Sequence, residues 1–396
     1  MKKVIIIIIF FLSLSINLFC QLQYFYVESN QTDVNYAPQD SNLIIRNTST
    51  QINKLFLFLG GTYSSPKHYR FICSVAANFG YDAISLSYPN YVPVYPLGNS
   101  SDSLVFDKFR QEVCFGTPQS SHIVADTLNS IYTRTLKLIQ YLSVTYPSQN
   151  WGQYLLSPTT LDWSKIAVSG HSQGSGHAAY LAKYFLVERN VMFSGPNDYS
   201  SYYNCSAHWL RQAGVTPRNK QFVFLHLQDE LVPFEHQFIN ILGLGMLQTD
   251  DTTNVDIVLP PYLNSHCLYS NYEPIFNENY HNSTCIGIYT PINSGDIVFL
   301  PVWQYMLTTS VSTEITNSHT EIPKIQIFPN PSTGLFIIEG ENIKSIVIFN
   351  IRGQTIKQLL TDNYQSSINL SNQPKGVYII KIVTDKGTTV KKVVSK

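Results

Sequence analysis

The sequence predicts two folded domains: a mixed α/β domain with a doubly wound, mainly parallel sheet, then a small all-β, immunoglobulin-like sandwich. Up to residue 307, continuous apolar runs typical of buried strands alternate with segments of helical period. After a polar, linker-like stretch at 308–322, short β-branched runs follow one another between turn residues, without a helical period. A chain of 396 residues is long enough to build a core in each domain.

The N-terminal stretch MKKVIIIIIFFLSLSINLFCQ predicts export from the cytoplasm. Two lysines precede an apolar run that is too short to span a bilayer comfortably, and a polar chain follows. We expect a signal peptide over residues 1–20, cleaved just before Gln21. An uncleaved membrane anchor is the alternative interpretation.

Charge and cysteine content narrow the partners that the chain is expected to bind. The formal net charge is zero and 13% of residues are charged, so no electrostatic field favours nucleic acid or an acidic membrane. Five cysteines remain after cleavage, and their spacings match no zinc pattern, so no metal is expected. In an oxidising compartment Cys73 could pair with Cys114 and Cys267 with Cys285, although sequence alone does not fix the connectivity.

The α/β domain is expected to span residues 21–307. Its predicted strands are KLFLFLGG (54–61), YDAISLSY (81–88), KIAVSG (165–170), VMFSG (191–195), QFVFLHL (221–227) and NVDIVL (254–259). Helices are predicted from about Pro66, from Ser121, after residue 172 to about Leu186, from about Pro233, and over Val302–Leu307. Repeated strand–helix alternation implies right-handed crossovers and helices on both faces of the sheet. Residues 89–122 show no sustained period and are expected to be a surface insertion.

One motif in this domain points to nucleophilic catalysis. Gly170-His171-Ser172-Gln173-Gly174 fits G-x-S-x-G and lies between a predicted strand and an alanine-rich helix. A nucleophile needs such a sharp strand-to-helix turn because the turn lifts its hydroxyl above the sheet. The two glycines let strand and helix approach closely without a collision of Cβ atoms. We therefore expect Ser172 to be a nucleophile.

A dinucleotide site is the competing interpretation of the same stretch. Residues 174–179, GSGHAA, match G-x-G-x-x-A, and Asp198 follows about twenty positions later. Such a fingerprint normally follows the first strand of its domain, whereas several strand–helix units precede this one. The serine interpretation is therefore favoured, and no cofactor is expected.

A nucleophilic serine needs a histidine to take its proton and a carboxylate to orient that histidine. Asp229, just after the strand QFVFLHL, is the expected acid, and Asp198 is the alternative. Two histidines could serve as the base. His266 is preferred because it follows NVDIVL, which is expected to be the last strand, and His281 lies one loop later.

Two backbone amides are expected to form the oxyanion hole. One should come from Gln173, the residue after the nucleophile, and the other from Thr62, which follows the glycine pair of KLFLFLGG. A tight turn without a catalytic role is the alternative explanation of that glycine pair.

The stretch DWSKIAVSGHSQGSGHAAYLAKYF (162–185) resembles the nucleophile region of secreted bacterial esterase- and lipase-like α/β-hydrolases, and the resemblance covers about residues 40–306. It implies hydrolysis of a small-molecule or polymeric ester through an acyl-serine, without a metal or cofactor. The alternative is a surface-displayed binding or adhesion protein on an inactive hydrolase scaffold. Its tyrosine-rich segments YPNYVPVYP (88–96) and DYSSYYN (198–204) would then contact sugars or proteins.

The tail, expected over residues 323–396, resembles the type A sorting domain of the type IX secretion system. The matching residues are FPNPSTG (328–334), IFNIRGQ (348–354), PKGVYIIKI (374–382) and the terminal VKKVVSK. The resemblance implies recognition by the secretion machinery and a secreted or cell-surface location. An unrelated immunoglobulin-like or carbohydrate-binding module is the alternative.

Overall fold

A computed structural model of the chain describes residues 22–36, 40–246, 252–310, 325–350, 355–361, 364–385 and 387–396. The expected signal peptide at 1–20, and most of the expected linker at 308–322, lie outside these residues. Within the described ranges, no helix is both long and apolar enough to cross a membrane.

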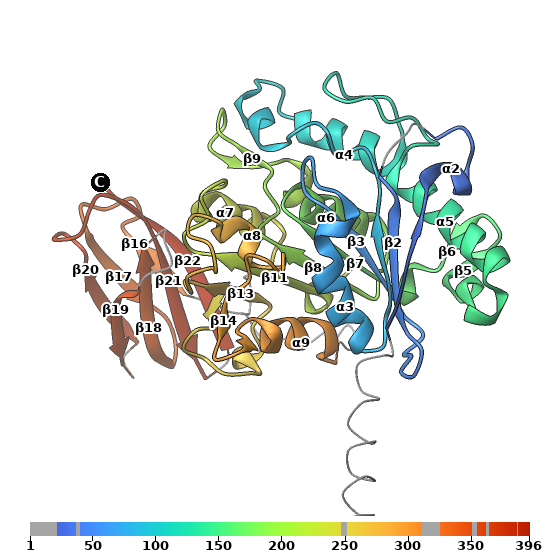
Figure 1. Cartoon of the computed structure of the whole chain (residues 1–396). Helices are drawn as coiled ribbons and strands as arrows, with labels where there is room; N and C mark the ends of the chain where they lie inside the picture. Colours follow the sequence, from blue (N-terminus) through green and yellow to red (C-terminus); the bar gives the residue numbers. More distant parts are fainter. Residues whose placement is uncertain are drawn as a thin grey trace, which may run out of the picture.

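A nine-stranded sheet organises the first domain (Figure 1). Its strands, in spatial order, are β1 (Leu22–Val27), β2 (Asn42–Asn47), β4 (Asp82–Leu86), β3 (Leu55–Leu59), β7 (Ile166–His171), β8 (Arg189–Phe193), β11 (Gln221–His226), β13 (Cys267–Ser270) and β12 (Thr252–Asn254). Strands β4 to β12 pair in parallel, and β1 and β2 add an antiparallel edge. The predicted doubly wound, mainly parallel sheet is confirmed.

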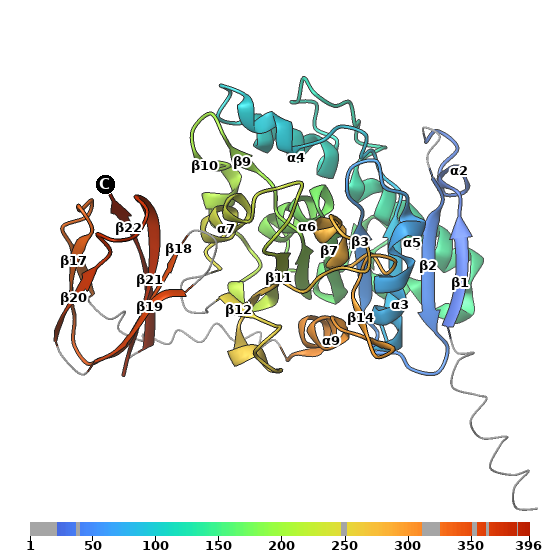
Figure 2. The same ribbon diagram turned by 60° about the vertical axis from the view of Figure 1, so that its left-hand side comes forward.

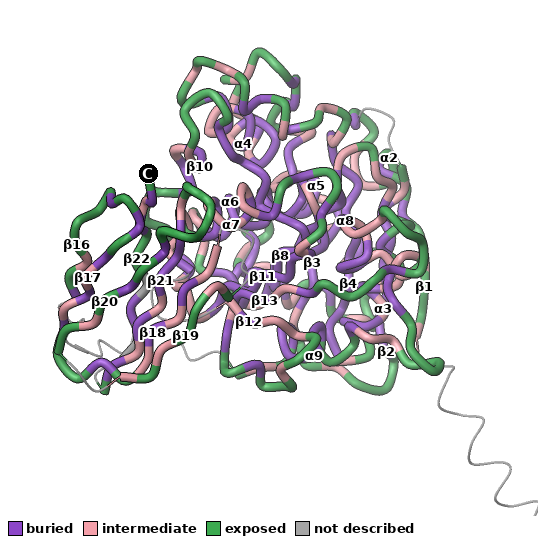
Figure 3. Tube along the Cα trace, turned by 90° about the vertical axis from the view of Figure 1, so that its left-hand side faces the viewer, coloured by how far each residue is buried: buried purple, intermediate pink, exposed green. Residues whose placement is uncertain are grey.

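Both faces of this sheet are covered, which explains the continuous apolar runs in the sequence. In β3, Leu55, Leu57 and Leu59 belong to one hydrophobic core, and Phe56 and Phe58 belong to the other. Figure 3 shows the central strands as the buried centre of the domain. The first core packs α4 (Val105–Phe115), α5 (Ile131–Thr145), α6 (Gln173–Tyr184) and α7 (Phe234–Gly243), and the second packs α3 (Arg70–Asn78) and α9 (Leu300–Thr308).

Short elements connect the sheet and its helices. They are α2 (Ser29–Thr32), α8 (Tyr280–Ser283), the pair β5 (Leu155–Ser157) with β6 (Thr160–Leu161), the pair β9 (Tyr199–Ser200) with β10 (Cys205–Ser206), and the pair β14 (Ile292–Asn293) with β15 (Asp296–Ile297). The expected insertion at 89–122 carries helix α4, although its sequence shows no sustained helical period. Helix α5 begins at Ile131 rather than at Ser121, because the Ser130 side chain accepts a hydrogen bond from Thr133 N and caps it there.

One predicted strand is wrong, and the error affects the site. In NVDIVL only Asn254 belongs to a strand, and β13, which begins at Cys267, pairs with β11 instead. The Asn254 side chain accepts a hydrogen bond from Asp256 N at 2.8 Å, and the Asp256 carboxylate accepts bonds from Ser270 Oγ and Asn271 N. These local side-chain bonds turn the backbone out of the ladder.

Neither of the two possible disulfides forms. Cys73, Cys114, Cys267 and Cys285 are all free and buried. Cys73 and Cys285 belong to one hydrophobic core, whereas Cys114 and Cys267 belong to the core on the opposite face of the sheet. Each expected pair would therefore have to cross the sheet, which a disulfide cannot do.

The tail folds as the predicted all-β sandwich of two antiparallel sheets (Figure 2). One sheet holds β16 (Gln326–Phe328), β17 (Leu335–Glu339) and β20 (Gln365–Asn369), and the other holds β19 (Thr355–Leu360), β18 (Ile343–Asn350), β21 (Gly376–Thr384) and β22 (Gly387–Ser395). Alternating residues of these strands, such as Phe336 and Ile338, and Ile346 and Ile348, meet in one core.

Candidate active site

Ser172 occupies the turn between strand β7 and helix α6. Its backbone has φ 55° and ψ −122°, a strained conformation for a residue with a side chain. A Cβ atom added at Gly170 would collide with the backbone of Gly174, and one added at Gly174 would collide with the carbonyl oxygen of Leu59. Both motif glycines are therefore required by the close approach of α6 to β7 and β3. The turn leaves Ser172 half-buried, in the wall of a cavity.

Asp229 follows strand β11 and is held by hydrogen bonds to both carboxylate oxygens. Oδ2 accepts from His281 Nδ1 at 2.6 Å and from Gln237 Nε2 at 2.8 Å, and Oδ1 accepts from the backbone N–H groups of Leu231 and Val232. Burial alone would raise the pKa of Asp229. The contact with His281 and the hydrogen bonds outweigh burial, so the pKa of this carboxyl lies below its ordinary value. The carboxylate is thus charged and fixed against one imidazole nitrogen.

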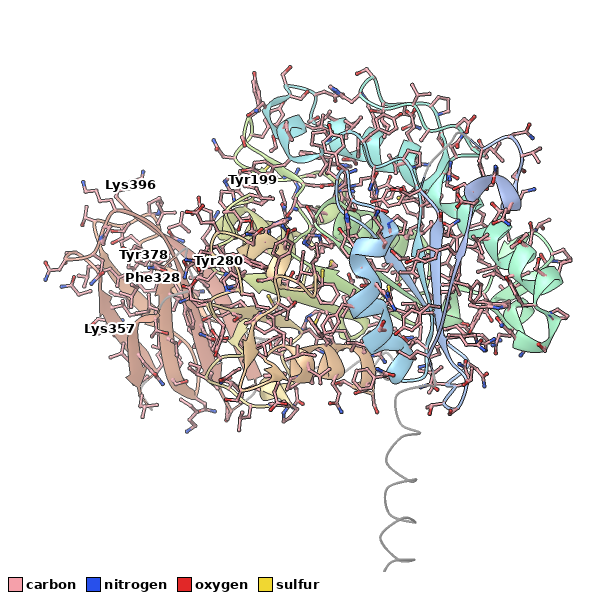
Figure 4. All side chains as sticks on the ribbon, viewed as in Figure 1. Tyr199, Tyr280, Phe328, Lys357, Tyr378 and Lys396 are labelled. Carbon is pink, nitrogen blue, oxygen red and sulfur yellow. The ribbon has the colours of Figure 1, made fainter. Side chains whose placement is uncertain are left out.

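His281 lies in the short helix α8, directly after Tyr280, which is labelled in Figure 4. Its backbone N–H donates to Glu230 Oε2 at 2.9 Å, so two consecutive acidic residues, Asp229 and Glu230, both accept hydrogen bonds from this histidine. Its Nε2 is buried and has no hydrogen-bond partner among the described residues. His281 and Ser172 line the same cavity. Glu230 was not expected at the site, because an acidic residue in a loop carries no signal of what it binds.

Ser172 and His281 thus lie on one cavity wall, and the Nε2 atom of His281 has no hydrogen-bond partner there among the described residues. An imidazole fixed at Nδ1 by a carboxylate keeps Nε2 free to accept a proton from a hydroxyl. Hydrogen bonds of this kind are often long before substrate binds. The arrangement can therefore supply a nucleophile, a base and a group that orients the base.

The structure does not bring His266 to this site, so the preference for it is corrected. His266 directly precedes β13, and its Nδ1 lies 2.9 Å from the carbonyl oxygen of Gln221, the first residue of β11. Asp229 follows the last residue of the same strand, so His266 and Asp229 lie at opposite ends of β11. The imidazole of His266 stacks on Phe222, with ring centroids 4.2 Å apart.

The carboxylate of Asp198, the alternative acid, also binds residues away from His281. Its carboxylate receives two hydrogen bonds from the buried Arg110 guanidinium, at 2.5 and 2.9 Å, and one from Trp209 Nε1 at 2.7 Å. Arg110 in turn donates to the carbonyl oxygen of Gln173. Asp198 therefore supports the start of helix α6 and does not contact a histidine within the described structure.

Thr62 and Gln173, the expected oxyanion-hole residues, lie beside each other at the cavity. The Thr62 hydroxyl donates to Gln173 Oε1 at 2.7 Å, and Val94 N donates to the same oxygen at 3.1 Å. Neither backbone N–H, of Thr62 or of Gln173, has a hydrogen-bond partner in the part of the chain described. A Cβ atom at Gly61 would lie 3.1 Å from Ser172 Cβ, so this loop passes directly against the serine. Two free amides are thus available near the Ser172 hydroxyl.

A buried chain of hydrogen bonds connects this loop with the backbone of His281. Gly61 N–H donates to the Tyr69 hydroxyl at 2.8 Å, and that hydroxyl lies 3.1 Å from His171 Nδ1. His171 Nε2 lies 3.0 Å from the carbonyl oxygen of His281. A carbonyl only accepts, so Nε2 carries the proton and Nδ1 accepts from Tyr69. Both ring nitrogens of His171 thus make hydrogen bonds within the protein, and neither is free to take a proton from Ser172.

The cavity has a volume of about 1170 Å³, and much of its wall is apolar. Its aromatic lining comes from separate parts of the chain, namely Tyr24, Tyr63, Tyr69, Phe71, Tyr95 and Tyr289. The tyrosine-rich segment at 88–96 thus contributes to the wall. Within the residues described, no cluster of His, Cys, Asp and Glu side chains could hold a metal ion.

We expect the free energy of unfolding to fall in mild acid, because the protein buries two neutral histidines. Burial lowers the pKa of His171 to about 3 and that of His266 to about 4, from an ordinary 6.5. Their contribution to stability is complete above pH 6.5 and is lost as the pH falls, because the unfolded chain binds protons that the folded chain does not. Each histidine should lower the free energy of unfolding by about 1.4 kcal/mol per pH unit between about pH 6 and pH 4.5.

Urea unfolding over this pH range measures that slope. His266→Gln, which keeps an amide donor for the Gln221 carbonyl, should reduce the slope by about 1.4 kcal/mol per pH unit. The matched control is the exposed His122→Gln, which should leave the slope unchanged. Equal slopes for wild type and His266→Gln would contradict the assignment of a neutral, buried His266.

Comparison with known proteins identifies the tail. Residues 326–396 match the family described as "Secretion system C-terminal sorting domain". The tail is a sorting domain. Such a domain marks proteins that the type IX secretion system exports, so the chain is delivered to the cell surface or released from the cell. No curated protein matches the chain.

Among solved structures, the chain is similar to a dienelactone hydrolase from Anabaena variabilis, at 13% identity and a TM-score of 0.32, covering 67% of this chain and 93% of that one. It is also similar to a bacterial heroin esterase, at 13% identity and a TM-score of 0.37, with coverage of 72% and 82%. A protein from Bacteroides vulgatus with an immunoglobulin-like β-sandwich is 15% identical, with a TM-score of 0.15 and coverage of 17% and 82%. The α/β-hydrolase fold of the first domain follows from its own topology: a helix-covered, mainly parallel sheet with a serine on the strained turn after a central strand.

Proposed function

We propose that this exported protein is a serine hydrolase that cleaves carboxylic esters. The observation that carries the proposal is the 2.6 Å hydrogen bond between Asp229 and His281 Nδ1, with His281 Nε2 left free on the same cavity wall as Ser172. Export is consistent with this chemistry, because the reaction needs only an ester and water.

In the proposed reaction His281 Nε2 takes the proton of the Ser172 hydroxyl as its oxygen attacks the ester carbonyl. The charged Asp229 stabilises the imidazolium that forms, and the N–H groups of Gln173 and Thr62 stabilise the oxyanion. His281 then gives its proton to the leaving alcohol, which leaves an acyl-serine. Water activated by the same imidazole hydrolyses the acyl-serine and restores Ser172.

Packing around the motif disfavours the dinucleotide interpretation. The space beside Gly174 is taken by the carbonyl oxygen of Leu59, and the space beside Gly176 is taken by the Arg110 guanidinium. A pyrophosphate needs those glycine surfaces open, because its oxygens approach the backbone there. Asp198, which would bind the ribose, is paired with Arg110.

A screen of residues 21–396, which leave out the expected signal peptide, tests the proposal. We expect turnover of short-chain 4-nitrophenyl esters, and progressive loss of that turnover on incubation with an alkyl fluorophosphonate. A folded protein that hydrolyses none of these esters and takes up no fluorophosphonate would instead support the binding or adhesion alternative. Binding of a nicotinamide cofactor would support the dinucleotide interpretation.

A further inference from the structure

Lys67 and Arg70 differ from the other cationic side chains of the first domain. Within the described residues, no carboxylate lies within ion-pair distance of either group, and neither charged end makes a hydrogen bond to the protein. Arg70 instead stacks on the ring of Tyr24, with its guanidinium carbon 4.3 Å from the ring centroid. Both residues are exposed.

Every other lysine and arginine of residues 22–310 has a polar partner. Seven form ion pairs with carboxylates: Arg46, Lys54, Lys108, Arg110, Lys137, Lys165 and Arg189. Five others donate hydrogen bonds to backbone or side-chain acceptors: Arg134, Lys183, Arg211, Arg218 and Lys220. Lys67 and Arg70 are thus the two cations of this range whose charged ends have neither a carboxylate nor a hydrogen-bond acceptor of the protein within reach among the described residues.

These two charges lie on the wall of the cavity that contains Ser172. Lys67 belongs to the short helix at Pro66–Tyr69, and Arg70 begins helix α3. Residues three apart on successive helical turns point to similar sides, so the two cations act on the same region. No aspartate or glutamate lines this cavity among the described residues, and the rest of its wall combines aromatic and aliphatic side chains with uncharged polar ones such as Thr62, Gln173 and Asn197. The cavity therefore has a positive potential at one part of its wall.

We propose that the cavity accepts esters that carry a second, anionic group, and that Lys67 and Arg70 bind this group while Ser172 reacts with the ester. The inference rests on the proposed ester hydrolysis. A carboxylate on the acyl or the alcohol part of the substrate has the required chemistry, since it accepts hydrogen bonds from an ammonium and a guanidinium. The apolar walls then contact the part of the substrate between the carboxylate and the ester.

Matched pairs of substrates test this inference. The acyl pair is the mono-4-nitrophenyl ester of adipic acid and its neutral methyl ester; the alcohol pair is 4-acetoxybenzoate and its methyl ester. At low salt, kcat/KM should be roughly tenfold higher for the anionic member of at least one pair, mainly through KM. The pair that shows the preference tells which part carries the anion. About 0.5 M NaCl should reduce the preference, because salt screens exposed charges.

The variant Lys67→Gln/Arg70→Gln should bring the ratio of the two kcat/KM values close to one. The matched control is Lys391→Gln/Lys392→Gln, which removes two exposed charges from strand β22 of the sorting domain and should keep the wild-type ratio. Equal kcat/KM values for both members of both pairs in the wild type, or a preference that survives in Lys67→Gln/Arg70→Gln, would overturn the inference. Ser172-dependent hydrolysis of the neutral esters would still support the proposed function, whereas hydrolysis that persists in Ser172→Ala would contradict that function.

Discussion

Replacing Ser172 by alanine is expected to lower kcat for a 4-nitrophenyl ester by about 10⁵-fold, while the protein keeps its fold. The loss is large because every step of the proposed reaction passes through the serine oxygen. The substitution should not destabilise the protein, since the Ser172 side chain makes no hydrogen bond within the described residues. Steady-state kinetics together with thermal melting measures both effects.

Ser74→Ala is the matched control for this variant. Ser74 lines the same cavity, and its hydroxyl donates a hydrogen bond to the carbonyl oxygen of Arg70 and lies 3.2 Å from the Tyr24 hydroxyl. Its kcat should stay within about twofold of the wild type, as for surface substitutions away from the reacting atoms. Turnover by Ser172→Ala comparable to that of Ser74→Ala would remove Ser172 from the mechanism.

Replacing His281 by glutamine is expected to lower kcat by about as much as loss of the serine, because the two residues act as one unit. The glutamine amide can still donate to Asp229, so the buried carboxylate is not left unpaired. His266→Gln is the paired variant, and its kcat should remain within about threefold of the wild type. The reverse order of effects would restore His266 as the base and contradict the geometry at Asp229.

The parts of the fold that depend on hydrophobic pattern could be predicted from the sequence. LFLFL in β3 and IAVSGH in β7 are apolar because helices cover both faces of the sheet, and they appear as continuous runs. The Ser172 turn could be predicted for a different reason. Only glycine fits at positions 170 and 174, so the two glycines of the motif indicate that a helix packs closely on the strand.

The base could not be predicted because its position depends on strand β13, which has no strand-like pattern. CLYS is four residues long and has no alternation, whereas NVDIVL has the right composition but is turned out of the sheet by Asn254 and Asp256. If NVDIVL were the last strand, His266 would follow that strand and lie at the carboxyl end of the sheet. Because CLYS is the strand instead, His266 precedes it and lies at the amino end. One misplaced strand therefore changed the choice between two histidines.

The antiparallel edge and the position of Glu230 were missed for related reasons. Strand β1, LQYFYV, lies at the edge of the sheet and is partly exposed, so its pattern is less apolar than that of a central strand. Glu230 binds a backbone N–H that is 51 residues away in sequence. Such long-range contacts depend on the geometry of the loops, which neither the amino-acid composition nor the hydrophobic period of the sequence predicts.

Labelling with a fluorophosphonate, followed by mass spectrometry of the proteolytic peptides, tests the central claim most directly. We expect one adduct per chain, on Ser172 of the peptide that contains residues 166–182, formed at similar rates in wild type and His266→Gln. The rate should be lower by several orders of magnitude in His281→Gln. An adduct on another residue, or equal labelling rates in His281→Gln and the wild type, would show that Ser172, His281 and Asp229 do not act together.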